Sequence, residues 1–252
     1  MSFVASTPLV TNLYHIVDTL STLLSDVVFF VDHDCIRIGL FDAKNTGLVH
    51  ATLNSFETFQ ASGAHSFGVN LQCLLKVLKT IKDAKDVTFV QTSSSPTLEI
   101  RANITEGCTV IHKLATLDLD KKYVVLPDHG YDMIAEVATA PLYNTFRTMT
   151  QVADFVEVYA SHAGSPKKQL ELRAKGSFSD QYVLFEENEF FELCRHRNPN
   201  AFLGKFDLKA TAKYAKGMNL SKKVTLRLTE GLPLNMEYAT PLGPVSFCVS
   251  AE

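Results

Sequence analysis

Four stretches of the chain repeat apolar residues at intervals of three and four, and this spacing predicts four amphipathic helices. The first stretch begins at Thr7-Pro8, a residue pair that suits a helix start, because threonine caps backbone N–H groups and proline lacks one. The second lies within residues 70–82, the third opens at Ala140-Pro141, and the fourth lies within residues 207–223. The apolar face of the first helix consists of Leu9, Leu13, Ile16, Val17, Leu20, Leu23 and Leu24.

Short runs rich in β-branched and aromatic residues separate these helices and predict strands. In the first half they cover residues 26–31, 35–38, 48–53, 56–60, 87–91, 97–102 and 109–117. In the second half they cover residues 154–159, 169–174, 181–185, 224–229 and 233–238. Each half therefore reads as a helix, several strands, a second helix and several strands.

The two halves also match residue by residue, because residues 70–89 can be laid over residues 207–226 without a gap. The overlay aligns Leu71 with Leu208, Lys76 with Lys213, Lys79 with Lys216 and Lys85 with Lys222. Such internal similarity indicates a duplicated unit. We therefore expect an N-terminal domain of residues 1–117, a connector of residues 118–133 that ends in turn residues, and a similar C-terminal domain of residues 134–252.

Charge distinguishes these two helices from the rest of the chain. The net charge is −3, yet residues 70–82 hold three lysines and no acid, and residues 207–223 hold five lysines and one aspartate. An acidic protein that concentrates lysine on two helices is expected to meet an anionic partner there. The alternative is that each helix simply carries lysine on a solvated face.

The composition and termini indicate an intracellular protein. No apolar run approaches the roughly 18 residues that a membrane span requires, so no membrane partner is expected. The first ten residues, MSFVASTPLV, lack the basic segment of a secretory signal. The five cysteines are odd in number and show no CxxC spacing, which favours free thiols in a reducing compartment.

The sequence contains no convincing catalytic site, cofactor motif or metal site. Phosphate-binding, dinucleotide-binding and nucleophile-elbow motifs are absent. Asp32-His33-Asp34-Cys35 has metal-ligand residue types but sits at a predicted hairpin, without a second ligand pair. Asp118 and Asp120 are better explained as connector residues, and Cys73 as a packing residue. We therefore expect a binding protein that is not an enzyme and needs no cofactor or metal.

Several short segments together resemble proliferating cell nuclear antigen, the sliding clamp family. They are Phe67-Gly68-Val69-Asn70-Leu71, the helix with Lys76 and Lys79, Leu117-Asp118-Leu119-Asp120, and Pro233-Leu234 with Glu237-Tyr238. The order and spacing of these segments match the family over nearly the whole chain, from the first helix to Val249. The chain resembles a divergent member, and a viral origin is left open.

The resemblance implies an α+β fold of two similar clamp domains, with antiparallel sheets outside and two helices per domain lining a ring. Three subunits would join head to tail around double-stranded DNA. Lysine suits such a ring, because flexible point charges hold phosphates without reading bases. By matching positions, the DNA-binding residues would be Lys76, Lys79, Arg147, Lys209, Lys213, Lys216 and His15.

The first helix departs from the family pattern. Tyr14 and His15 stand where relatives carry a lysine pair, and Ser21 replaces a further lysine. His15 is read either as a residue that charges near phosphates or as an ordinary exposed histidine.

The resemblance also implies a pocket beside the connector for an extended partner peptide that bears a glutamine and a hydrophobic helical turn. The matching positions are Phe41, Leu48, Val124, Leu126, Pro233, Phe247, Cys248 and Ser250. Cys248 replaces a tyrosine of the relatives, which would make the pocket wider or shallower. Leu48 and Pro233 are also open to a reading as core residues.

In the family, subunits join by pairing edge strands. The corresponding segments here are residues 109–117 and 179–187, with Leu114, Val183 and Phe185 as packing residues of the subunit interface.

The expected function is a DNA sliding clamp that tethers DNA polymerase and other proteins with clamp-binding peptide motifs. A clamp loader would be a further partner, and the nucleus the expected location. The alternative is a clamp-fold protein repurposed as a transcription or checkpoint factor, either monomeric or hetero-oligomeric.

Overall fold

The computed structural model of the chain describes residues 2–92, 95–126, 130–161, 166–197 and 201–252. The chain forms two compact units. The first consists of Met1–Ala43, Val49–Leu126 and Thr240–Val245, and the second of Lys44–Leu48, Pro127–Ala239 and Ser246–Glu252. The first nine residues of the expected connector, 118–126, thus pack with the first unit.

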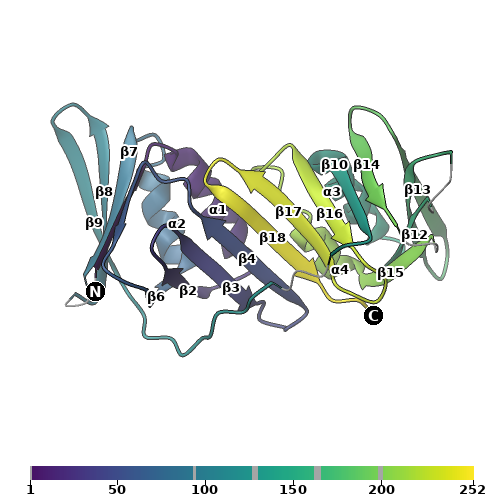
Figure 1. The fold of residues 1–252 in the computed structure, drawn as a ribbon, viewed down its shortest axis with the longest axis horizontal. Coiled ribbons are helices and arrows are strands. Elements are labelled where there is room, and N and C mark those ends of the chain that lie inside the picture. The colour runs from purple at the N-terminus through teal and green to yellow at the C-terminus, as the bar shows by residue number, and fades with distance from the viewer. Residues whose placement is uncertain (1, 93–94, 127–129, 162–165, 198–200) are drawn as a thin grey trace. The chain divides into compact units, whose positions relative to one another are not determined.

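Each half of the chain contains nine strands and two helices among the residues that the structure describes (Figure 1). The first half runs β1 (Ser2–Thr7), α1 (Val10–Ser21), β2 (Asp26–Val31), β3 (Ile36–Phe41), β4 (Gly47–Leu53), β5 (Thr58–Ala61), β6 (His65–Asn70), α2 (Leu71–Thr80), β7 (Asp86–Thr92), β8 (Thr97–Thr105) and β9 (Cys108–Ala115). The second half runs β10 (Met133–Ala138), α3 (Thr139–Met149), β11 (Phe155–Ala160), β12 (Gln169–Lys175), β13 (Asp180–Glu186), β14 (Phe191–His196), β15 (Phe202–Asp207), α4 (Leu208–Tyr214), β16 (Lys223–Leu228), β17 (Leu234–Thr240) and β18 (Gly243–Val249).

The strand order repeats element for element between the halves. In the first half the orders are β5-β1-β7-β8-β9 and β4-β3-β2-β6; in the second they are β14-β10-β16-β17-β18 and β13-β12-β11-β15. The strand pairs within each unit are antiparallel. The expected α+β class with antiparallel sheets is confirmed, and the shared topology supports the duplication inferred from the overlay.

The core of the first unit lies between its helices and sheets. α1 buries Val10, Leu13, Ile16, Val17 and Leu20, and α2 buries Leu71, Leu74 and Leu78. The two helices lie side by side, and Gln72 Nε2 on α2 donates to the Ser21 carbonyl at the end of α1, 3.2 Å away. The apolar faces therefore meet the sheets and leave the opposite faces to solvent.

An aromatic cluster anchors the core of the second unit. The Tyr214 and Phe247 rings stack with centroids 5.7 Å apart, and Tyr238 meets Phe247 edge to face at 5.8 Å. The Tyr238 hydroxyl donates to the Tyr214 carbonyl over 3.1 Å, which satisfies a polar group at a buried position. Because Tyr214 ends α4, this cluster fixes that helix against β17 and β18.

Some predicted boundaries were wrong. α1 begins at Val10, not at Thr7-Pro8, because Thr7 ends a strand, β1, that the periodicity did not predict. The Thr7 hydroxyl still accepts a hydrogen bond from the Leu9 N–H at 3.1 Å. α4 ends at Tyr214, so Lys216 follows the helix. The strands β6, β10, β14 and β15 were also not predicted.

Candidate nucleic-acid interface and partner surfaces

α2 presents a cationic face opposite its buried leucines. Lys76 and Lys79 are exposed. The Asn70 side chain caps the helix by accepting from the Cys73 N–H at 2.9 Å, and its amide donates to Asp26 of β2 at 2.7 Å. The cap and the link to β2 fix the helix axis, so both lysines point away from the core.

The second unit places three further cations on or beside its helices. Arg147 is exposed in the last turn of α3, and Lys213 is exposed in the last turn of α4. Lys216 is exposed two residues beyond α4. These positions favour cations, since the C-terminal end of a helix carries partial negative charge.

Most of these cations have no ion-pair partner within the part of the chain that the structure describes: Lys76, Lys79, Arg147, Lys213 and Lys216. Lys209 lies 3.8 Å from Asp154, but both side chains are more than three-quarters exposed, so solvent weakens that pair. The positive charge on these helices is therefore free to meet an external anion.

α1 carries no lysine or arginine. His15 is half-buried and lies edge to face against Tyr14, with ring centroids 5.4 Å apart. Its Nδ1 is buried and has no hydrogen-bond partner among the described residues. Asp18 is the only other ionisable group on the helix besides Tyr14, so α1 adds no fixed positive charge.

Two strands stand at the ends of their sheets. β9 ends the order β5-β1-β7-β8-β9, and β13 ends the order β13-β12-β11-β15. Their helix-side faces carry the three residues expected at the subunit interface, Leu114, Val183 and Phe185, each half-buried. Two polar neighbours on those faces reach the helices: His112 contacts Thr80 of α2 at 3.3 Å, and Gln181 donates to Thr148 of α3 at 3.2 Å.

The outer faces of these strands expose large apolar side chains that the sequence interpretation did not select. Ile111 on β9 is 54% exposed, and on β13 Tyr182 is 55% and Leu184 48% exposed. The alternation along each run is the signal that would have identified them, since every second residue of an edge strand faces outward. Charges differ as well: β9 carries Lys113 and no acid, whereas β13 carries Asp180 and Glu186 and no base.

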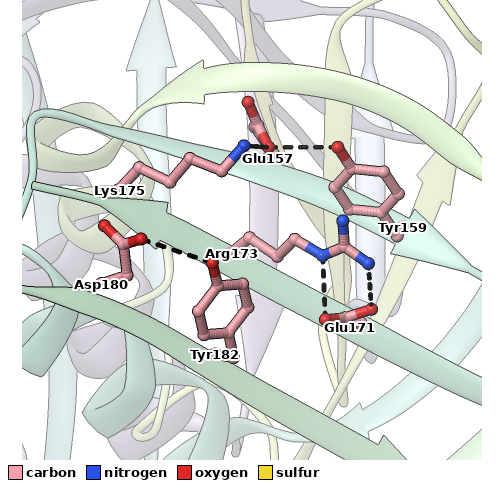
Figure 2. A network of polar contacts seen from close by, with 7 residues as sticks. All are labelled: Glu157, Tyr159, Glu171, Arg173, Lys175, Asp180 and Tyr182. Carbon is pink, nitrogen blue, oxygen red and sulfur yellow. Dashed lines mark hydrogen bonds and ion pairs between the residues drawn. The ribbon is translucent and has the colours of Figure 1, made fainter.

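A polar network covers the outer face beside β13 (Figure 2). Arg173 makes two 2.8 Å hydrogen bonds to Glu171, and its guanidinium lies 3.9 Å from the Tyr159 ring centroid. These bonds lower the pKa of Glu171, because Arg173 stabilises the carboxylate. Glu157 accepts from the Tyr159 hydroxyl at 3.1 Å and pairs with Lys175 at 3.3 Å. The charges pair with one another, and the contacts of Arg173 with Tyr159 and of Lys175 with Glu157 link β12 to β11.

The expected peptide-pocket residues of the first unit are accessible. Phe41 at the end of β3 is 50% exposed, and Val124 and Leu126 are half-buried. Val125 between them is 69% exposed and was missed by the sequence interpretation. The signal that could have identified Val125 is an apolar residue within the segment read as a domain connector.

The expected pocket residues of the second unit divide into two groups. Pro233 and Ser250 are exposed, whereas Leu48, Phe247 and Cys248 are buried. Phe247 is fully enclosed by the aromatic cluster, and burial raises the pKa of the Cys248 thiol to about 12. Leu48 and Phe247 therefore serve core packing in this unit.

Two further findings concern membranes and metals. Among the helices that the structure describes, none combines the length and hydropathy needed to cross a bilayer. Among the residues that the structure describes, no group of three or more His, Cys, Asp or Glu side chains lies close enough together to hold a metal ion.

Residues 7–123 match the family described as proliferating cell nuclear antigen, N-terminal domain. The chain is 23% identical over 232 residues to the probable DNA polymerase sliding clamp of Autographa californica nuclear polyhedrosis virus, covering 90% of this chain and 86% of that protein. It is 25% identical over 227 residues to the DNA polymerase sliding clamp of Pyrococcus horikoshii, covering 88% and 87% respectively.

A solved structure shows the same fold. The proliferating cellular nuclear antigen from Entamoeba histolytica superposes with a TM-score of 0.85 at 19% sequence identity, covering 99% of this chain and 98% of that chain. The resemblance inferred from the sequence is thereby confirmed.

Proposed function

We propose that this chain, which has the fold of proliferating cell nuclear antigen and matches that family over residues 7–123, is a DNA sliding clamp. In this function it encircles duplex DNA as a ring and tethers a DNA polymerase, with no catalysis of its own. The observation that carries the proposal is the repeated cationic helix. α2 and the α4 region carry Lys76, Lys79, Lys213 and Lys216, which are exposed and have no ion-pair partner among the described residues, at positions that the overlay of the two halves aligns.

Phosphate binding explains why lysines stand at these positions. A clamp must hold the DNA backbone strongly enough to stay on it, yet form no base-specific contact that would stop sliding. Lysine supplies charge at the end of a flexible stem, and displaced counterions make such binding favourable and salt-dependent. Arg147 and Lys209 would add phosphate contacts from the second unit. α1 would contribute only His15.

The ring is proposed to form by antiparallel pairing of β9 of one copy with β13 of the next, giving a homotrimer. Both strands end their sheets, and an unpaired sheet edge is a template for another strand. The opposite charges of the two strands favour their mutual pairing over pairing of either with itself.

The proposed partners follow from the same function. The exposed Phe41 and the half-buried Val124 and Leu126 of the first unit would bind polymerase-derived peptides with a glutamine and a hydrophobic helical turn. A clamp loader would open the ring, and the nucleus is the proposed location.

Neutralising the aligned lysines tests the proposal. With Lys76, Lys79, Lys213 and Lys216 all changed to alanine, affinity for a duplex should fall about tenfold or more, and its salt dependence should flatten. Circular dichroism should stay native, because the four side chains are exposed and alanine favours helix. Fluorescence anisotropy with labelled duplex at several salt concentrations measures both quantities.

A matched control removes the same charge elsewhere. Lys44, Lys122, Lys168 and Lys223 are exposed and lie outside the four helices. Their alanine variant should keep most of the affinity. If both variants lose affinity equally, net charge rather than the helix surface binds DNA, and the proposed interface is wrong.

One observation favours a second candidate function, a clamp-fold transcription or checkpoint factor that acts as a monomer or hetero-oligomer. α1 lacks lysine and arginine, so one of the four helices contributes no fixed cation to a DNA-facing surface. The two functions differ in assembly, which a mass measurement distinguishes.

A further inference from the structure

The connector crosses β6, β2, β3 and β4, four neighbouring strands of one sheet, strand by strand. Leu117 forms two 2.9 Å backbone hydrogen bonds with Gly68 of β6, and Lys121 Nζ donates to the Asp26 carbonyl of β2 at 2.7 Å. The Val124 N–H then donates to the Gly39 carbonyl of β3 at 3.0 Å. Tyr123 contacts His50 of β4. These contacts follow the spatial order β6, β2, β3 and β4.

Two glycines allow the connector to lie this close. A Cβ on Gly68 would meet the Leu117 carbonyl oxygen at 2.6 Å, and a Cβ on Gly39 would meet the Val124 carbonyl oxygen at 2.5 Å. Neither glycine has a positive φ, so backbone conformation does not require glycine at either position. Glycine inside a strand marks the close approach of another backbone. Both positions are therefore shaped to receive the connector.

Tyr123 makes the most extensive of these contacts. Its ring lies directly over Gly39, where an added Cβ would meet the ring at 2.7 Å. Phe30 of β2 packs edge to face on it at 5.3 Å, and 2.5 Å separates the hydroxyl from His50 Nε2 on β4. Burial raises the pKa of the hydroxyl, which keeps it protonated and able to hydrogen-bond at neutral pH. One side chain thus contacts three adjacent strands.

We propose that Tyr123 is a positioning residue that holds the connector against the sheet, so that Val124, Val125 and Leu126 form a preorganised surface for an extended partner peptide. This inference rests on the proposed function and extends it. Val125 and Phe41 expose apolar area on this surface, and an ordered connector lowers the entropy cost of covering it with a hydrophobic peptide side chain.

The test compares Tyr123→Ala with Tyr123→Phe, Gly39→Ala and the neighbouring exposed control Lys122→Ala. Hydrogen exchange reports whether the Val124 amide stays bonded to Gly39. A synthetic peptide with a glutamine and a hydrophobic helical turn measures binding. Tyr123→Ala and Gly39→Ala should both speed exchange at Val124. If either substitution reduces the fraction of chains whose connector is ordered for peptide binding to about one-tenth, peptide affinity falls about tenfold.

Tyr123→Phe keeps the ring on Gly39 and loses only the contact to His50, so its effects should be intermediate. Lys122→Ala should match wild type in both assays, and duplex binding should not change in any variant. Unchanged exchange at Val124 in Tyr123→Ala would overturn the proposal, and so would faster exchange with unchanged peptide affinity. A wild-type chain that binds no such peptide would instead refute the peptide surface of the proposed function, and the positioning role with it.

Discussion

Burial separates the five cysteines into residues with different expected reactivity. All five are free; Cys35 and Cys248 are buried, whereas Cys73, Cys108 and Cys194 are exposed. The expectation that Cys73 is a packing residue was therefore wrong, because Cys73 lies on the solvent-facing side of α2. Reactivity follows the thiolate, and burial raises the pKa of both Cys35 and Cys248 by disfavouring the charged form. The rate at which each thiol reacts therefore indicates whether that cysteine is buried or exposed.

We expect alkylation of the native chain at pH 8 to modify the exposed Cys73 and Cys108 fastest and the buried Cys248 slowest. Because the Cys248 pKa is raised to about 12, its thiolate fraction at pH 8 is small and increases only as the pH approaches that value. Mass spectrometry of digested samples taken over time measures each rate. Modification of Cys248 as fast as in the unfolded chain would contradict its burial in the second unit.

At the scale of elements, the proposed ring pairs the free edge of β9 in one copy with the free edge of β13 in the next copy. In antiparallel pairing, residue numbers run in opposite directions on the two strands. A register that places Ile111 opposite Tyr182 therefore also places Lys113 opposite Asp180. This register joins two exposed apolar side chains and two opposite charges.

Charge reversal tests that register. Lys113→Glu and Asp180→Lys should each weaken assembly a few-fold, because like charges then face each other across the strands. The double variant should recover assembly, since the pair is restored with its direction reversed. Analytical ultracentrifugation over a dilution series gives the association constants. Additive losses in the double variant would exclude this register, and Lys122→Glu on the connector is the control for charge alone.

At the scale of the whole molecule, assembly decides between the two candidate functions. We expect a solution mass near three times 27.9 kDa, because a closed ring satisfies every β9 and β13 edge. Light scattering at micromolar concentration measures this mass. A mass of one chain that persists at high concentration would favour the monomeric or hetero-oligomeric alternative.

Much of the fold was predictable from local periodicity. The runs at residues 26–31 and 87–91 became β2 and β7 within one residue at each end, because each strand buries one or both faces. β1 was missed because Ser2–Thr7 is short, and Thr7, its last residue, was read together with Pro8 as the start of a helix. α4 ended before its expected last turn, since Tyr214 turns into the aromatic core and Gly217 lies closely under Tyr238.

The candidate sites were predictable to differing degrees. The exposed state of Lys76 and Lys79 followed from the leucines opposite them, because helical periodicity relates the two faces. The contact of Tyr123 with Gly39 could not be found this way. Those residues lie on different elements, and nothing in the connector's own pattern indicates the strand that it covers.

The sequence alone determined the duplication and the side of α2 that carries lysines, since these depend on spacing within a few turns or on comparison of one half with the other. The fold class came from the resemblance to a known family. Only the tertiary structure decided which strands end their sheets and where the connector lies. It also decided that Phe247 belongs to a core. These features depend on contacts between residues far apart in the chain, and such contacts are selected by packing of the whole unit rather than by local pattern.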